Sequence, residues 1–161
     1  MYTLHPPAVG SSSECKNYSF VNVWETFSTD RPSKALVTES TVTCFAMGNA
    51  GGGSSLIFAG TDSGDVIMWD TRGITESAEG YVAKLCEVKS GEMPVLFPVY
   101  ETCHMSTSER PHSSAIVSIV SEDKMVCSLD DRGCVTTWYV ADVNANKSLY
   151  EGDLGVTGEA R

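Results

Sequence analysis

The sequence predicts an all-β fold, and three observations support this expectation. Short runs rich in Val, Ile, Thr and aromatic residues recur along the chain, and these residue types fit a pleated sheet. In two segments of similar sequence, a pair of such runs is joined by a tight turn that contains Asp and Gly. No window of helical length shows a sustained apolar period of 3.6 residues, so no helix is placed.

The two similar segments are residues 56–70 and residues 125–139. In each, an apolar strand leads into a turn where Gly can take a positive φ and Asp can hydrogen-bond the turn backbone, and a second strand then runs to Trp. Both segments are therefore predicted β-hairpins. Residues 19–24 form a third, partial copy that lacks the turn. The aligned pairs are Asp62 with Asp131, Gly64 with Gly133, Val66 with Val135, and Trp69 with Trp138.

Further strand-like runs flank the hairpins. Residues 40–47 and residues 114–120 alternate apolar and polar positions before the first and the second hairpin. Residues 32–38 follow the partial copy, and residues 81–88, with weaker alternation, follow the first hairpin. The resulting order is strands c and d of one unit, a to d of a second, and a to c of a third. This is the layout of β-propeller blades, which have four antiparallel strands each.

The spacing of the tryptophans fits blades of the WD type with an insertion between two of them. Trp69 lies 45 residues after Trp24, within the roughly 40–45 residues of such a blade. Trp138 follows 69 residues later, and the excess chain holds three prolines, with residues 93–100 as a candidate edge strand. A closed propeller needs about 4–8 blades. The sequence therefore predicts a partial WD-type β-propeller of about two blades plus flanking strands, a fragment of a larger domain.

The predicted domain organisation follows from these units. Residues 1–17 are expected to be a flexible N-terminal segment, and residues 144–161 an acidic, flexible tail. The partial propeller occupies residues 18–143 between them. Within it the sequence predicts the end of one blade at 18–39, a second blade at 40–89, an insertion at 90–112 and a third, partial blade at 113–143.

Charge and composition limit the kind of partner. The 161 residues carry 21 acidic and 11 basic side chains, a net charge of −10, and the basic residues are scattered. Nucleic acids and anionic membranes need clustered Lys and Arg, so neither is expected to bind. No apolar run approaches the roughly 18 residues of a membrane helix. The six cysteines form no C-x-x-C pair and several lie in apolar runs, so we expect reduced thiols in the cytoplasm.

No residue pattern predicts catalysis, a metal ion or a cofactor. Cys103 and His104 are adjacent, and neighbours on an extended chain point opposite ways and rarely share one tetrahedral ion. The glycine run at 51–53 lacks the Lys and helix start that hold phosphate, and there is no Gly-x-Ser-x-Gly nucleophile elbow. Turn chemistry accounts for the aspartates and blade packing for the tryptophans. The positions assigned are therefore structural: Trp24, Asp62, Gly64, Trp69, Asp131, Gly133 and Trp138.

These residues carry a resemblance to the WD-repeat dynein intermediate chain family. Val23-Trp24, the run 32–44 and the run 56–70, with Ala-Gly-Thr-Asp-x-Gly-x-Val before Trp-Asp, look like its WD-repeat region, and 128–140 is similar to a blade ending in that family. The match is closest to the branch of cytoplasmic dynein-2, the motor of retrograde intraflagellar transport. The resemblance covers residues 21–140. The copies lack the Gly-His opening of a generic WD repeat, and the second ends in Trp-Tyr.

The resemblance implies a non-catalytic scaffold. Such a propeller docks on the dynein heavy chain and works with the other dynein-2 subunits in cilium assembly, in the cytoplasm, the cytoskeleton and the cilium. Direct microtubule binding is not expected, because the microtubule surface is acidic like this chain. Two alternatives stay open. One is a generic WD-repeat adaptor unrelated to dynein, and the other is an enzyme, which would need titratable residues converging in one pocket.

Overall fold

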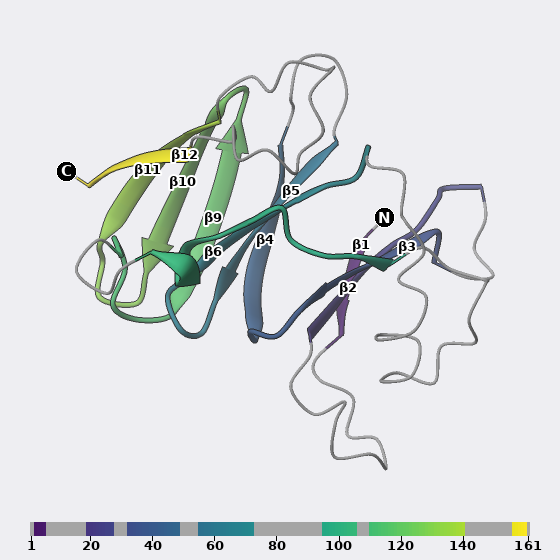
Figure 1. Cartoon of the computed structure of the whole chain (residues 1–161), viewed down its shortest axis with the longest axis horizontal. Coiled ribbons are helices and arrows are strands. Elements are labelled where there is room, and N and C mark those ends of the chain that lie inside the picture. The colour runs from purple at the N-terminus through teal and green to yellow at the C-terminus, as the bar shows by residue number, and fades with distance from the viewer. Residues whose placement is uncertain are drawn as a thin grey trace, which may run out of the picture. The chain divides into compact units, whose positions relative to one another are not determined.

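A computed structural model describes residues 2–5, 19–27, 32–48, 55–72, 95–105, 110–140 and 156–160 (Figure 1). These residues form strands and one three-residue 3-10 helix, so the predicted all-β class is confirmed. The strands make three four-stranded sheets, in the orders β1-β2-β3-β7, β4-β5-β6-β8 and β12-β11-β10-β9. Among the described residues, no helix has the length and apolar character needed to cross a membrane.

The chain divides into two compact units, Met1–Val42 with Arg72–Pro98, and Thr43–Thr71 with Val99–Arg161. In the first unit, β1 (Tyr2–His5) pairs antiparallel with β2 (Ser19–Val23), and β2 pairs antiparallel with β3 (Lys34–Thr38). β7 (Val95–Leu96) adds to β3 in parallel. The fully buried side chains on these strands include Val21, Leu36 and Val37.

The start of the first unit differs from the sequence expectation. Residues 1–17 were expected to be flexible, yet Tyr2–His5 forms β1. The strand-favouring residues of this segment pair with β2, whose other edge is taken by β3, so the pairing satisfies backbone groups that an open edge would leave free. Residues 6–17 lie outside the described part. Trp24 follows β2 directly and is half-buried.

The second unit begins with the sheet of β4 (Val42–Gly48), β5 (Leu56–Thr61), β6 (Val66–Asp70) and β8 (Tyr100–Glu101). β5 and β6 form the first predicted hairpin. β8 holds the fourth position, for which the sequence suggested residues 81–88, and those residues lie outside the described part. The predicted insertion at 90–112 therefore supplies a strand. Its edge position is compatible with Pro98, which lies two residues before it.

The last sheet contains β9 (Ile116–Glu122), β10 (Met125–Asp130), β11 (Val135–Val140) and β12 (Val156–Ala160). β10 and β11 are the second predicted hairpin. The sequence predicts three strands here and a flexible tail at 144–161, whereas β12 pairs with β11 and completes a four-stranded antiparallel sheet. Val156 and Thr157 favour extended backbone and lie opposite Val140 and Tyr139.

The core of the second unit lies between its two sheets. Phe58 and Met68, opposite each other on β5 and β6, share a cluster with Val126 and Trp138, opposite each other on β10 and β11. The Gly60 backbone of β5 lies close to the Ile116 side chain of β9. A Cβ added to Gly60 would lie 2.4 Å from Cγ2 of Ile116, so only glycine fits there without movement.

Candidate functional site

A chain of buried polar side chains crosses the inner face of the last sheet. His112 precedes β9, Ser128 lies on β10, Asp130 ends β10 and Trp138 lies on β11, and all four are buried. Trp138 Nε1 donates to Ser128 Oγ at 2.8 Å, and Ser128 Oγ lies 2.6 Å from His112 Nε2. The other ring nitrogen, His112 Nδ1, lies 3.2 Å from Asp130 Oδ2. The segment before β9 and both strands of the hairpin are thereby tied together.

The chemistry of the two ends sets the direction of the hydrogen bonds in this network when the His112 ring carries a single proton. The indole N–H of Trp138 is only a donor, so Ser128 Oγ accepts from it. An ionised Asp130 is only an acceptor, so the proton of the neutral His112 ring is assigned to Nδ1. His112 Nε2 then accepts the hydroxyl proton of Ser128. Every donor has one acceptor, which makes this a satisfied buried network of the kind that specifies a unique packing.

The second carboxylate oxygen of Asp130 organises the β10–β11 turn. Asp130 Oδ1 accepts the backbone N–H of Arg132 at 3.1 Å and that of Cys134 at 2.8 Å. Burial favours the protonated form of Asp130, but the hydrogen bonds from Cys134, His112 and Arg132 outweigh it, and the pKa of this carboxyl is lowered from its ordinary value of 3.8.

This lowered pKa predicts a loss of stability in acid. A carboxyl whose pKa is lower in the folded state contributes stability that is fully present above its unfolded value, here 3.8, and that disappears as the pH falls through the folded value. We expect the free energy of unfolding to fall more steeply below about pH 4 in the parent chain than in Asp130→Asn. Denaturant titrations at a series of pH values measure this, and parallel curves for the two chains would contradict it.

The β5–β6 turn is built like the β10–β11 turn, with Thr61 in the place of Asp130. Thr61 Oγ1 accepts the backbone N–H of Asp65 at 2.9 Å, as Asp130 Oδ1 accepts that of Cys134 at 2.8 Å. Gly64 and Gly133 both have positive φ, +86° and +84°. The sequence predicts that Asp62 and Asp131 bond the turn backbone. Both are exposed, and the residue before each of them makes the bond.

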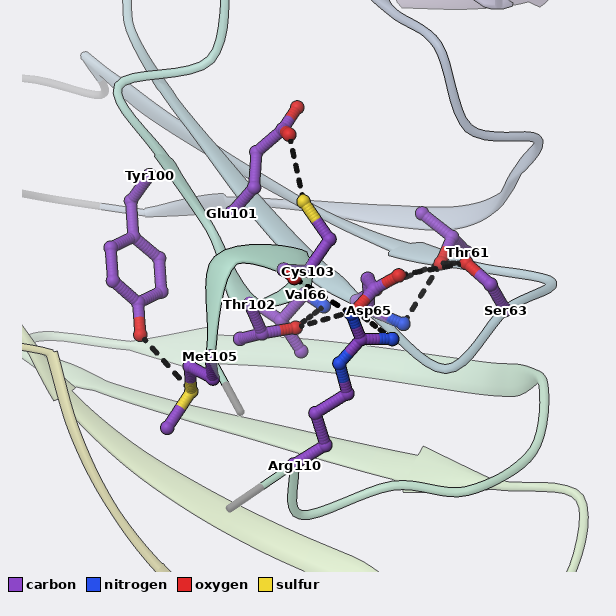
Figure 2. Close-up of polar contacts among 10 residues, drawn as sticks. All are labelled: Thr61, Ser63, Asp65, Val66, Tyr100, Glu101, Thr102, Cys103, Met105 and Arg110. Carbon is purple, nitrogen blue, oxygen red and sulfur yellow. Dashed lines mark hydrogen bonds and ion pairs between the residues drawn. The ribbon is translucent and has the colours of Figure 1, made fainter. Parts of the chain in front are cut away.

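A second polar cluster surrounds the buried Asp65 (Figure 2). Asp65 Oδ2 accepts the hydroxyl proton of Ser63 at 2.8 Å, and Oδ1 accepts that of Thr102 at 3.1 Å. The Thr102 oxygen in turn accepts the N–H of Val66 at 3.0 Å. Arg110 Nη1 lies 3.8 Å from Asp65 Oδ1. These contacts hold the 3-10 helix η2 (Thr102–His104) against the β5–β6 turn.

The Cys103 thiol in this cluster has a raised pKa. Partial burial, a hydrogen bond to Glu101 Oε2 at 3.2 Å and the charges of Glu101 and Asp65 raise the pKa to about 11, against the opposing charge of Arg110. The thiolate is the reactive form of cysteine. Cys103 is therefore a poor nucleophile at neutral pH.

Alkylation with iodoacetamide tests this property of Cys103. At pH 8 we expect Cys103 to react much more slowly in the folded chain than in the denatured chain, because only a small fraction is thiolate. Glu101→Gln, which removes the negative charge, should accelerate the reaction. Peptide mass spectrometry gives the rates, and a rate that levels off below about pH 9 would contradict the raised pKa.

One group of side chains has the composition of a metal site. Ligand atoms of His112, Asp130 and Cys134 all lie within 4.8 Å of one another. Both ring nitrogens of His112 already have hydrogen-bond partners, and Cys134 Sγ lies 3.6 Å from the Pro111 carbonyl oxygen. A metal ion would have to replace the proton on His112 Nδ1. The arrangement is accounted for by the hydrogen-bond network.

The sequence and the structure agree on the tryptophans more closely than on the polar residues. Trp69 and Trp138 are fully buried at equivalent places in the two hairpins. Sequence reasoning did not bring His112, Ser128 and Asp130 together. The available signal was a His shortly before a strand, followed by Ser and Asp on the next strand. Four described cysteines are free thiols: Cys44, Cys103, Cys127 and Cys134.

Comparisons with known proteins add no assignment. Neither protein-family models nor curated proteins gave a match to this sequence.

Proposed function

We propose that this chain is part of a WD-type β-propeller that serves as a non-catalytic docking scaffold, resembling a dynein-2 intermediate chain that binds the dynein heavy chain in retrograde intraflagellar transport and cilium assembly. The observation that carries the proposal is the buried chain from Trp138 through Ser128 and His112 to Asp130. WD repeats are recognised by a His at the opening of the blade and a Trp at its end. Pro111-His112 stands at that opening here, ahead of β9.

The repetition of the sheets also supports a propeller. Two turns with the same backbone geometry, at Gly64 and Gly133, end the second strand of successive sheets. The face of β10 and β11 that carries Trp138 packs on the face of β5 and β6 that carries Phe58, which is the opposite face in the aligned repeat. When one face of each sheet packs on the opposite face of the next sheet, the packing can continue from sheet to sheet. The radial repetition of a propeller requires this.

The polar chemistry supports binding rather than catalysis. Each oxygen of Asp65 and of Asp130 accepts at least one hydrogen bond within the protein. Cys103, the thiol beside Asp65, is held protonated. A general base needs a lone pair that can accept a proton from the substrate, and a nucleophile needs one that can attack it. In these groups the carboxylate oxygens already accept hydrogen bonds within the protein.

Co-purification with dynein heavy chains tests the proposal. The tagged chain, with its folding checked by circular dichroism, is expressed with the dynein-2 heavy chain and, in parallel, with the dynein-1 heavy chain. We expect the dynein-2 heavy chain to be recovered with the tagged chain. The control variant Arg132→Ala, which changes an exposed residue, should recover the same amount of dynein-2 heavy chain. Recovery of neither heavy chain by the folded protein would reject the dynein assignment and leave an adaptor unrelated to dynein.

A further inference from the structure

The segment before β9 and the β10–β11 turn bring three metal-binding side chains together. His112, Asp130 and Cys134 each offer one ligand atom, and these atoms all lie within 4.8 Å of one another. His112 and Asp130 are buried, and Cys134, directly before β11, is half-buried. An imidazole, a carboxylate and a thiolate are the ligands that zinc takes in proteins. The cluster therefore has the chemistry of a zinc site.

Two of the three ligand atoms already have the spacing that one ion needs. His112 Nδ1 lies 3.2 Å from Asp130 Oδ2. Two ligands with bonds of about 2.0–2.1 Å to a tetrahedral zinc ion lie roughly 3.3 Å apart, and a sulfur bonded at about 2.3 Å lies roughly 3.6 Å from each. Cys134 Sγ therefore has to move by roughly 1 Å. Its hydrogen bond to the Pro111 carbonyl oxygen is long, 3.6 Å, and opposes this movement little.

Hydrogen bonds already orient the two buried ligands. Asp130 Oδ1 accepts the backbone N–H groups of Arg132 and Cys134, at 3.1 Å and 2.8 Å. Asp130 Oδ2 is the oxygen that faces His112. On the other side of the ring, His112 Nε2 lies 2.6 Å from Ser128 Oγ. Metal-binding carboxylates and the second nitrogen of metal-binding histidines are held by hydrogen bonds of this kind.

A metal ion at His112 Nδ1 requires the ring proton on Nε2, and the network can accommodate this change. Nε2 then donates to Ser128 Oγ, which can accept from His112 and Trp138 at once because a hydroxyl oxygen has two lone pairs. The Ser128 hydroxyl proton then needs a new acceptor. Thr136 lies directly opposite Ser128 and is fully buried, and its Oγ1 has no hydrogen-bond partner among the described residues. Cross-strand Ser and Thr side chains form hydrogen bonds with each other.

We propose that His112 Nδ1, Asp130 Oδ2 and Cys134 Sγ bind one zinc ion, with water as the fourth ligand. On binding, the Cys134 thiol releases its proton to solvent, and the His112 ring keeps a single proton, now on Nε2. The carboxylate and the thiolate together balance the charge of the ion. The site ties the segment before β9 to the β10–β11 turn. This inference goes beyond the docking function proposed above and does not depend on it.

Titration of the full chain with cobalt(II), which takes the same ligands as zinc, tests the site. A thiolate bound to tetrahedral cobalt gives a charge-transfer band in the near ultraviolet and strong visible bands. We expect both bands with one equivalent of cobalt, and their loss when zinc is added. Cys134→Ser should abolish the charge-transfer band. Cys127→Ser is the matched control and should retain it, because this half-buried thiol lies on the other face of β10.

Two further measurements follow the rearrangement of the network. Nitrogen-15 NMR of the His112 ring should show the proton on Nδ1 without zinc and on Nε2 with zinc. Thr136→Val removes the new acceptor for the Ser128 hydroxyl proton, so the affinity for zinc should fall by roughly tenfold, the worth of about one hydrogen bond. Thr137→Val, on the other face of β11, is the control and should leave the affinity unchanged.

Four results would overturn the inference, each obtained with protein whose folding is verified by circular dichroism. They are the absence of a charge-transfer band with cobalt, a band that persists in Cys134→Ser, a His112 ring proton that stays on Nδ1 when zinc is bound, and equal zinc affinities for Thr136→Val and the parent chain. Each of them leaves the recovery of dynein heavy chain unaffected, so the two proposals can fail separately.

Discussion

Replacing Trp138 by Ala is expected to lower the free energy of unfolding by about 3–5 kcal/mol. The indole is fully buried in the cluster between the two sheets of the second unit, and its N–H bonds to Ser128 Oγ at 2.8 Å. The substitution leaves a large cavity and removes the N–H that Ser128 Oγ accepts in the buried network. Denaturant unfolding followed by circular dichroism measures the loss.

Two further variants separate the causes of this effect. Trp138→Phe keeps most of the buried ring and removes the N–H, so we expect a loss of about 1–3 kcal/mol, and this variant stays measurable if the Ala variant does not fold. Tyr139→Ala is the matched control, because the neighbouring side chain is half-exposed on the opposite face. A Tyr139→Ala loss as large as that of Trp138→Ala would contradict the assignment of the buried core.

Replacing Gly64 by Ala is expected to destabilise the protein by about 1–3 kcal/mol more than the same change at Gly133. Both glycines have nearly the same positive φ, so both substitutions carry the cost of a left-handed backbone, about 1–2 kcal/mol. Their surroundings differ. A Cβ at Gly64 would lie 2.7 Å from the carbonyl oxygen of Ser114, whereas nothing lies within 4 Å of one at Gly133.

The comparison of these two variants isolates the close contact between the β5–β6 turn and the segment before β9. That segment begins at His112. A side chain at Gly64 would therefore also push on the residue that hydrogen-bonds Asp130 in the last sheet. Chemical denaturation of both variants under one condition gives the difference. Equal losses would show that the turn moves away from Ser114 at no cost.

Periodicity and turn chemistry determined the local structure. Residues 56–70 and 125–139 alternate or run apolar on either side of a glycine that needs positive φ, and both fold as the predicted hairpins. These features act within a few residues, so a single sequence displays them. The burial of Trp69 and Trp138 follows from the same repeat, because equivalent positions face equivalent neighbours.

Contacts between distant segments had no such local signature. β8 takes the fourth place in its sheet although 29 residues separate β6 from it, and its pairing with Ile67 and Met68 identifies it. Asp65 likewise looked like an ordinary turn residue, whereas burial and the hydroxyl of Thr102 make it the centre of a polar cluster.

The sequence by itself determined that this protein is built from repeated β-hairpins ending in Trp, because strand propensity and the glycine turn are properties of short segments. Only the tertiary structure decided that His112, Ser128 and Asp130 join Trp138 in one buried chain. Their partnership depends on distances across strands, which the order of residues along the chain does not contain. The place of Thr136 opposite Ser128 became visible in the same way, through the pairing register that sets which side chains share a face.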